Sequence, residues 1–129
     1  MMQTAKEVMT KDVVTVKPTM SVAEAIGVMQ DKGLRDLILE PVDANDAYGI
    51  VTEADIVYKV AAQSKNPETV LVNEIGTKPC IELDPEMTVQ EVAQLFANHH
   101  IHRAPVVKGE LLGIVTVFDI VRETMWWQG

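Results

Sequence analysis

The chain has 129 residues, of which 47% are hydrophobic and 23% charged, a balance that is ordinary for a globular domain with one core. No apolar run approaches the roughly 20 residues of a membrane span, and residues 1–10 lack the apolar core of a signal peptide. The net charge of -8 argues against nucleic acid or an anionic membrane as the main partner, while the single cysteine, Cys80, excludes an internal disulfide and fits a cytoplasmic location.

The first half of the chain predicts a strand, a helix, two strands and a second helix, over residues 13–16, 21–33, 36–40, 47–51 and 52–64. The first strand is a β-branched run, Val-Val-Thr-Val, that Pro18 closes. Ser21 and Glu24 have the spacing of a capping box, in which each side chain satisfies a backbone amide at the start of a helix. Gly33 stands where a helix C-cap is expected.

The second half predicts the same order of elements, over residues 80–83, 88 onward, 103–107, 111–115 and 117–126. Thr88 and Glu91 form the corresponding capping box. The tripeptide Asn-Pro-Glu at residues 66–68 marks a linker. The sequence therefore predicts two β-α-β-β-α units of the α/β (α+β) class. The first spans residues 1–65, a linker follows at 66–74, and the second unit spans 75–129.

The two halves repeat one another closely. Two cassettes, residues 49–57 and 113–121, read Gly-Ile-Val-Thr-Glu-Ala-Asp-Ile-Val and Gly-Ile-Val-Thr-Val-Phe-Asp-Ile-Val. The offset between copies is 67 residues upstream (10–24 against 77–91) and 64 at the cassettes, which places three extra residues in the polar stretch 42–48, a predicted loop. Units of about fifty residues are small to be stable alone, so we expect them to pack sheet to sheet about a pseudo-twofold axis, with a ligand cleft along it.

The Thr-x-x-Asp sequence in each cassette has two interpretations. Thr52 with Asp55, and Thr116 with Asp119, match a capping box, which needs no ligand. Alternatively, a strand that ends at a helix N-terminus presents free amides to an anion, and a carboxylate there can accept hydrogen bonds from a ribose diol. The glycine that opens each cassette favours the second interpretation, because a glycine lets another group approach the backbone.

Three features together resemble a tandem pair of CBS domains, also called a Bateman module. They are the two cassettes, residues 9–16 (Met-Thr-Lys-Asp-Val-Val-Thr-Val) and residues 101–107 (Ile-His-Arg-Ala-Pro-Val-Val). The resemblance covers residues 4–125. It implies a regulatory module that does no chemistry and binds an adenosine nucleotide (AMP, ADP or ATP, with Mg²⁺ accompanying ATP) or S-adenosylmethionine between its two units. It also implies an energy-state sensor that modulates a partner protein.

By this resemblance each ligand site draws on both units. The stronger site would combine Thr77, Ile81, Ile101, His102, Arg103, Ile50, Thr52 and Asp55. The other would combine Thr10, Val14, Leu34, Arg35, Asp36, Ile114, Thr116 and Asp119. In the stronger site the two isoleucines of the second unit would hold the base. The threonine of the cassette and the helix amides would take the phosphate, the aspartate would take the ribose hydroxyls, and His102 and Arg103 would neutralise phosphate charge.

The second site departs from the pattern. Where the second half has Arg103 and Pro105, the first half has Asp36 and Ile38. A carboxylate that faces a phosphate weakens binding, unless Arg35 covers it or a cation lies between them. The Arg103 site is therefore expected to bind more tightly.

The histidines and the cysteine are the remaining candidates for chemistry. His99, His100 and His102 are not expected to form a metal site, because adjacent histidines point to different sides and no further ligand stands at metal spacing. Cys80 lies on a predicted strand and is expected to be buried rather than reactive. No nucleophile–base pair stands out, so an enzyme is not expected. A nucleotide-free interaction module, whose cassettes only cap helices, remains the alternative.

We also expect self-association. The second helix of each unit carries apolar residues that one small core does not cover: Ile56, Val57, Val60, Ile120, Val121 and Met125. CBS pairs commonly join helix to helix, so the resemblance implies a homodimer, with Met125, Trp126 and Trp127 either closing the last helix or forming a further interface. The sequence names no regulated partner and leaves open whether the chain is a fragment of a larger protein.

Overall fold

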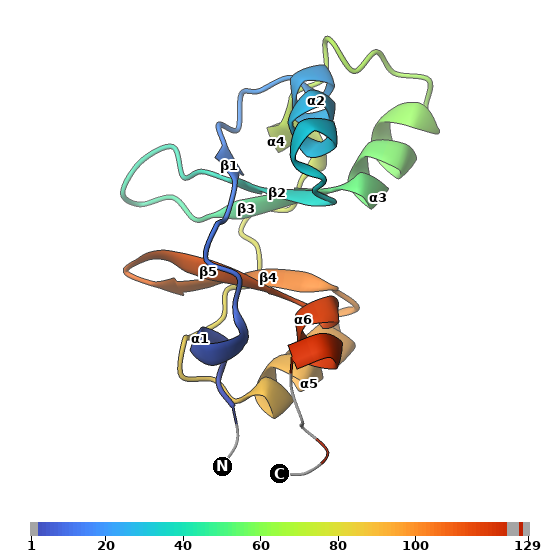
Figure 1. Cartoon of the computed structure of the whole chain (residues 1–129). Helices are drawn as coiled ribbons and strands as arrows, with labels where there is room; N and C mark the ends of the chain where they lie inside the picture. Colours follow the sequence, from blue (N-terminus) through green and yellow to red (C-terminus); the bar gives the residue numbers. More distant parts are fainter. Residues whose placement is uncertain (1–2, 124–126, 128–129) are drawn as a thin grey trace. The chain divides into compact units, whose positions relative to one another are not determined.

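The computed structural model describes residues 3–123 and 127, and the chain divides into two compact units. The central unit is Val14–Cys80, and the terminal unit combines Met1–Val13 with Ile81–Gly129 (Figure 1). Both are mixed helix-and-strand units, which confirms the predicted α/β class. The predicted β-α-β-β-α order is also found in both repeats, although the first strand of the second repeat is reduced to a bridge.

The central unit is built on a three-stranded sheet in the order β1-β2-β3. β1 (Thr15–Val16) runs parallel to β2 (Asp36–Leu39), which pairs antiparallel with β3 (Gly49–Thr52). The helices α2 (Val22–Lys32), α3 (Glu53–Ile56) and α4 (Val72–Ile75) lie on one side of this sheet (Figure 1). Alternate strand residues face them, and the core is Val16, Val22, Ala25, Met29, Leu37, Leu39, Val51, Val60, Val70, Val72 and Ile75.

The terminal unit is built on a hairpin of β4 (Arg103–Lys108) and β5 (Glu110–Thr116). The helices α1 (Ala5–Val8), α5 (Val89–His99) and α6 (Val117–Glu123) cover one face of the hairpin (Figure 1). The core between them consists of Ala5, Val8, Leu83, Val89, Val92, Phe96, Ala104, Val106, Val115 and Ile120.

The helix boundaries follow the predicted caps. Thr88 and Glu91 form the full capping box of α5, with the Thr88 amide 2.9 Å from Glu91 Oε1 and the Glu91 amide 3.1 Å from Thr88 Oγ1. At α2, Ser21 Oγ accepts from the Glu24 amide at 3.1 Å, and the described residues show only this half of the predicted box. Gly33 ends α2 in the left-handed conformation (φ 64°), and His100 takes the same conformation after α5 (φ 54°).

Three predicted elements differ from the structure. The helix expected over residues 52–64 changes type, because α3 continues as the π-helix η1 (Val57–Ala61). Residues 80–83 are not a strand; Leu83 forms an isolated parallel bridge with Val106, with its amide 2.8 Å from the Pro105 carbonyl. One bridge of this kind is too short to count as a strand. The last helix, expected to reach residue 126, is described to Glu123, and Met125 and Trp126 lie outside the described residues.

Two short helices that were not predicted, α1 and α4, occupy equivalent positions in the two repeats. Each leads into an extended residue that pairs with a cassette strand: Thr10 exchanges two backbone hydrogen bonds with Ile114, and Thr77 exchanges two with Ile50. The opening segment of the first repeat therefore pairs with the sheet of the second repeat. The opening segment of the second repeat pairs with the sheet of the first. The compact units therefore divide the chain after Val13 and after Cys80, whereas the sequence repeats are separated by the linker at residues 66–74.

The extra residues of the first repeat form a loop, as predicted, over residues 42–48. Lys78 anchors this loop, because its ammonium pairs with the Asp46 carboxylate and lies 3.4 Å from the Glu40 carbonyl. The Val42 amide also donates to Asp46 Oδ2 at 2.8 Å. The hydrogen bond from Lys78 and the amide of Val42 hold the pKa of Asp46 below its ordinary value of 3.8. The carboxylate that closes the loop is therefore ionised at neutral pH.

Candidate functional site

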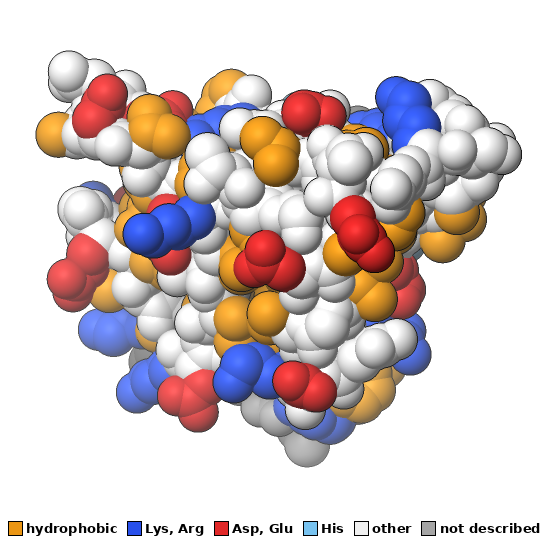
Figure 2. Space-filling model, turned by 90° about the horizontal axis from the view of Figure 1, so that it is seen from above, with side chains coloured by type: hydrophobic (Ala, Val, Ile, Leu, Met, Phe, Trp, Pro, Cys, Tyr) orange, Lys and Arg blue, Asp and Glu red, His pale blue; other side chains and the backbone are white. Residues whose placement is uncertain are grey.

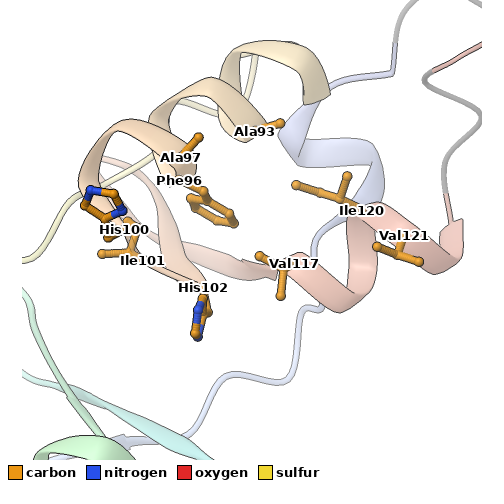
Figure 3. A pocket seen from close by; sticks show the side chains of 9 residues that line it. All are labelled: Ala93, Phe96, Ala97, His100, Ile101, His102, Val117, Ile120 and Val121. Atoms are coloured by element: carbon orange, nitrogen blue, oxygen red, sulfur yellow. The ribbon is translucent and has the colours of Figure 1, made fainter.

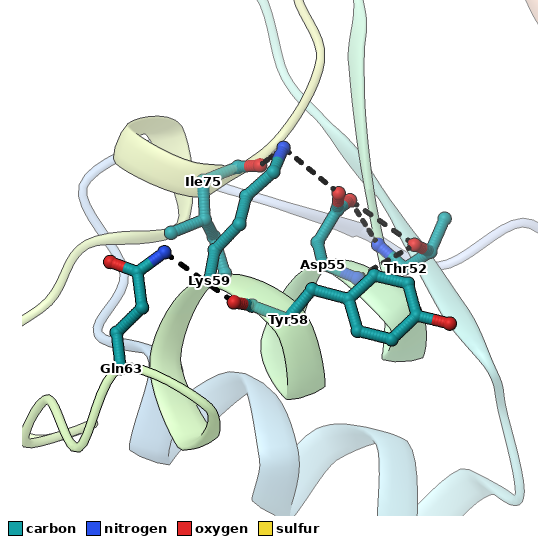
Figure 4. Close-up of polar contacts among 6 residues, drawn as sticks. All are labelled: Thr52, Asp55, Tyr58, Lys59, Gln63 and Ile75. Carbon is teal, nitrogen blue, oxygen red and sulfur yellow. Dashed lines mark hydrogen bonds and ion pairs between the residues drawn. The ribbon is translucent and has the colours of Figure 1, made fainter.

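The first cassette turn joins β3 to the helix α3 and forms a closed capping box. Asp55 Oδ2 accepts from the Thr52 amide at 2.9 Å and from the Thr52 hydroxyl at 3.2 Å (Figure 4). In return, Thr52 Oγ1 accepts from the Asp55 amide at 3.2 Å. The second carboxylate oxygen, Oδ1, lies 3.2 Å from Lys59 Nζ. The capping interpretation of this turn is therefore realised, and it uses one of the two carboxylate oxygens.

The second cassette turn repeats this geometry between β5 and α6. Asp119 Oδ2 accepts from the Thr116 amide at 2.9 Å and from its hydroxyl at 3.1 Å, and Thr116 Oγ1 accepts from the Asp119 amide at 3.2 Å. The Asp119 side chain is 6% exposed, and its Oδ1 lies 3.6 Å from Arg122 Nη2. The Asp55 side chain is 16% exposed. The first carboxylate is therefore the more accessible of the two.

The helix amides expected to bind phosphate are largely in use. The Glu53 amide donates to the Arg35 carbonyl at 3.0 Å, and the Asp55 amide donates to Thr52 Oγ1. In the other cassette the Val117 amide donates to the His102 carbonyl at 2.8 Å. Two of the first three amides of each helix are thus satisfied within the protein. A phosphate would have to rely on side chains more than on these helix starts.

The cassette glycines make room for the protein's own backbone. A Cβ built on Gly49 would lie 2.9 Å from the Thr77 carbonyl oxygen, and one on Gly113 would lie 2.8 Å from the Thr10 carbonyl oxygen. These are the segments that pair with Ile50 and Ile114. In the structure, the group that approaches each glycine is a neighbouring chain segment. The glycines therefore no longer favour a ligand over a simple cap.

The residues of the predicted stronger site fall into both units. The central unit holds Ile50, Thr52, Asp55 and Thr77, and the terminal unit holds Ile81, Ile101, His102 and Arg103. In the central half, the Ile50–Thr77 pairing and the Thr52–Asp55 box bring all four residues to the end of β3. In the terminal half, Ile101 is half-buried against the core, His102 is exposed and Arg103 opens β4 half-buried.

The residues of the second predicted site are divided in the opposite sense. The central unit holds Val14, Leu34, Arg35 and Asp36, and the terminal unit holds Thr10, Ile114, Thr116 and Asp119. The sheet register makes residues of the two predicted sites neighbours: Asp36 pairs with Thr52, and Arg103 pairs with Thr116. In each unit a charged residue at the start of one strand thus lies beside the capping threonine at the end of the next.

Sequence reasoning missed Lys59. Its ammonium reaches both Asp55 Oδ1 at 3.2 Å and the Ile75 carbonyl at 2.8 Å (Figure 4). The signal was available, because an acidic residue four positions before a lysine on a helix predicts an ion pair. The contact with Ile75 comes from α4, an element that was not predicted.

His99, His100 and His102 are exposed, and within the part of the chain that the structure describes no three His, Cys, Asp or Glu residues could hold one metal ion. Cys80 is buried at 9% exposure, as predicted.

Each unit has an apolar groove between its helices. In the terminal unit the groove between α5 and α6 has a volume of about 450 Å³, and Phe96, Val117 and Ile120 converge on it (Figure 3). In the central unit the corresponding groove between α2 and α3 has a volume of about 350 Å³ and includes Ile26 and Val57. Three exposed apolar side chains line the grooves: Val57, Val117 and Val121. Tyr58 and Phe118, which follow Val57 and Val117 in sequence, are also exposed.

One face of the molecule carries charges of both signs (Figure 2). On the face shown in Figure 2, Lys and Arg side chains are interspersed with Asp and Glu rather than gathered into one basic area. Among the helices that the structure describes, none has the length and apolar character needed to cross a membrane.

Comparison with known proteins places these features in one family. The model of the CBS domain matches residues 5–62 and 72–125. An uncharacterized protein of Methanopyrus kandleri is 36% identical over 118 residues, which cover 90% of this chain and 60% of that protein. This chain therefore spans less than two thirds of that relative.

Two solved structures are similar over the whole chain or nearly so. A hexameric CBS-CP12 protein from bloom-forming cyanobacteria is 48% identical, with a TM-score of 0.95, over 100% of this chain and 76% of that one. The CBS domain pair of protein MJ0100, in complex with methylthioadenosine and S-adenosyl-L-methionine, is 29% identical, with a TM-score of 0.81, over 95% of both chains. With both repeats matched by the family model, the chain belongs to the CBS domain family and carries a tandem pair of these domains.

Proposed function

We propose that this CBS pair is a cytoplasmic regulatory module that binds an adenosine-containing ligand and modulates a partner protein without catalysing a reaction. The similar CBS pair of MJ0100 is in complex with two adenosyl compounds, which supports this ligand class. The candidates are AMP, ADP and ATP, the last with Mg²⁺, and S-adenosylmethionine. Within this class we favour the nucleotides, which would make the module a sensor of energy state.

The observation that carries the proposal is the state of the cassette carboxylates. In each, Oδ2 is used by the capping threonine, whereas among the described residues Oδ1 faces one cationic side chain, at 3.2 Å (Asp55) or 3.6 Å (Asp119). A carboxylate oxygen can accept more than one hydrogen bond. Oδ1 therefore retains capacity for a ribose hydroxyl, and ligand binding does not require the helix cap to open.

We assign the tighter site to Asp55, Thr52, Ile50 and Thr77 acting with Ile81, Ile101, His102 and Arg103, and the weaker one to the set that includes Asp36 and Asp119. Arg103 supplies a cation for phosphate, whereas Asp36 places a second carboxylate in the other site. Because the helix amides are partly used, the cationic side chains carry more of the phosphate binding than the sequence pattern implied.

Calorimetric titration with AMP, ADP, ATP and S-adenosylmethionine tests the proposal. Binding of at least one of them is expected. An Asp55→Asn variant retains an acceptor for the Thr52 amide but loses the charge, so it should fold and bind about tenfold more weakly. Asp119→Asn is the matched control and should have the smaller effect on the tighter site. If no heat appears with any ligand at millimolar concentration, the alternative is favoured: a nucleotide-free interaction module whose cassettes only cap helices.

We further propose that the chain forms a homodimer through the α5–α6 and α2–α3 grooves. The hexameric assembly of the similar CBS-CP12 protein supports self-association in this family. The grooves are apolar, Val121 on the wall of one of them is 73% exposed, and Phe118 on the same helix is 61% exposed. Trp127 is 61% exposed and remains a candidate for a further interface. Light scattering should give at least twice the chain mass of 14.3 kDa, and Val121→Asp should shift it toward the monomer.

A further inference from the structure

The ammonium group of Lys59 contacts two partners within the central unit. Its Nζ lies 3.2 Å from Asp55 Oδ1 on α3 and 2.8 Å from the carbonyl oxygen of Ile75, the last residue of α4 (Figure 4). A surface lysine with one exposed partner is normally mobile, but two fixed partners from different elements restrict this one. The side chain is still 46% exposed, so a ligand can reach it.

Counting donors and acceptors shows what the pair has left. A lysine ammonium has three N–H donors, of which Asp55 and Ile75 use two. Asp55 Oδ2 is occupied by the amide and hydroxyl of Thr52, while Oδ1 has one partner within the described part of the chain, Lys59. One N–H donor and one carboxylate acceptor therefore remain on adjacent atoms. A single hydroxyl group can satisfy both, because it donates through its hydrogen and accepts through its oxygen.

We propose that Lys59 is a specificity-determining residue, which together with Asp55 Oδ1 reads one ribose hydroxyl of the bound ligand. This rests on the proposed function, the binding of an adenosine-containing ligand. Lys59 positions the carboxylate, donates to the hydroxyl oxygen and balances the charge of Asp55. A ligand that lacks this hydroxyl covers the third N–H donor of Lys59 and the remaining acceptor position of Oδ1 without pairing them, and a polar group that is desolvated but not paired is costly.

The second repeat does not supply the same pair. In the sequence, the position that corresponds to Lys59 is occupied by Glu123. The cation beside Asp119 is Arg122, one position earlier, and its guanidinium lies over the Phe118 ring at 4.8 Å from the centroid. Asp119 is also less accessible, at 4% exposure of the residue. We therefore assign hydroxyl selection to the first cassette. This assignment depends on Lys59 and on the accessibility of Asp55, and not on the presence of Arg103 in the same predicted site.

The test measures selectivity rather than affinity alone. AMP, 2′-deoxy-AMP and 3′-deoxy-AMP are titrated into the unsubstituted chain, into Lys59→Met and into the control Lys65→Met, an exposed lysine beyond the π-helix. The unsubstituted chain should prefer AMP over one of the two deoxy compounds by about tenfold. Lys59→Met should bind AMP about tenfold more weakly but that deoxy compound almost unchanged, so the preference disappears. Lys65→Met should retain it.

The outcomes separate two failures. If the unsubstituted chain binds AMP but Lys59→Met keeps the full preference, or loses affinity for all three compounds equally, Lys59 does not read a hydroxyl and the inference is wrong. If the unsubstituted chain binds none of the adenosine ligands, the proposed function is wrong, and this inference is then wrong as well. Thermal unfolding of Lys59→Met shows whether the fold is intact; a surface ion pair and one hydrogen bond should shift it only slightly.

Discussion

Replacing Gly49 by alanine tests the close packing between the cassette strand and the segment after α4. The added Cβ would lie 2.9 Å from the Thr77 carbonyl oxygen, 3.2 Å from Lys78 Cβ and 3.3 Å from Leu39 Cβ. The nearest of these is a backbone atom, and it is also the acceptor for the Ile50 amide at 2.9 Å. The strand or the segment must therefore move by several tenths of an ångström, with loss of geometry in that bridge.

Overpacking of this kind costs about 1–3 kcal/mol. We expect Gly49→Ala to lower the free energy of unfolding by about 2 kcal/mol and the melting temperature by about 5–10 °C for a chain of this size. Urea unfolding followed by circular dichroism measures the first and calorimetry the second.

Gly27 is the matched control. It lies inside α2 and a Cβ there meets nothing within 4 Å, so Gly27→Ala should stabilise the protein by about 0.5–1 kcal/mol through helix propensity. The two glycine variants should therefore change stability in opposite directions. A Gly49→Ala chain as stable as the parent would refute the argument that close backbone contact explains the glycine.

Two further predictions concern stability. His100 holds a left-handed conformation (φ 54°) without a glycine, so His100→Gly should raise the free energy of unfolding by about 0.5–1 kcal/mol in a urea titration, whereas Gly33→Ala, at φ 64°, should lower it by about 1 kcal/mol. The pKa of Asp46 is held below 3.8 by Lys78, so its stabilising effect is present above that pH and is lost as the pH falls through the lowered value. Asp46→Asn should melt earlier than the parent at neutral pH, and the difference should shrink below about pH 4; a difference that is constant with pH would contradict this assignment.

The sequence predicted those features that local chemistry determines. The capping boxes at Thr52 and Thr116, the αL cap at Gly33 and the loop at 42–48 all follow from residue types at short spacing. The features that the sequence did not predict depend on contacts between distant segments. The reason for the cassette glycines lies in Thr10 and Thr77, and no local pattern shows which segment approaches them.

The same limit applies to the candidate site. The pattern predicts Asp55 as a ligand contact but does not predict its ion-pair partner Lys59, since the second anchor of that lysine is a carbonyl on α4. The short helices α1 and α4 have four residues each and little periodicity to detect. The strand expected at residues 80–83 was wrong because alternating apolar residues predict burial more reliably than strand pairing, and Leu83 is indeed buried.

The exchange of opening segments bears on how such a chain could arise. The stretch from Ala5 to Thr10 completes the sheet of the later repeat, and the stretch from Val72 to Thr77 completes that of the earlier one. If a gene encoded one repeat, two identical chains could swap these stretches and form the same pair of units as a domain-swapped dimer. Duplication and fusion would then turn an intermolecular exchange into an intramolecular one, freeing each copy to change separately. The lysine at 59 and the glutamate at 123 are one such divergence.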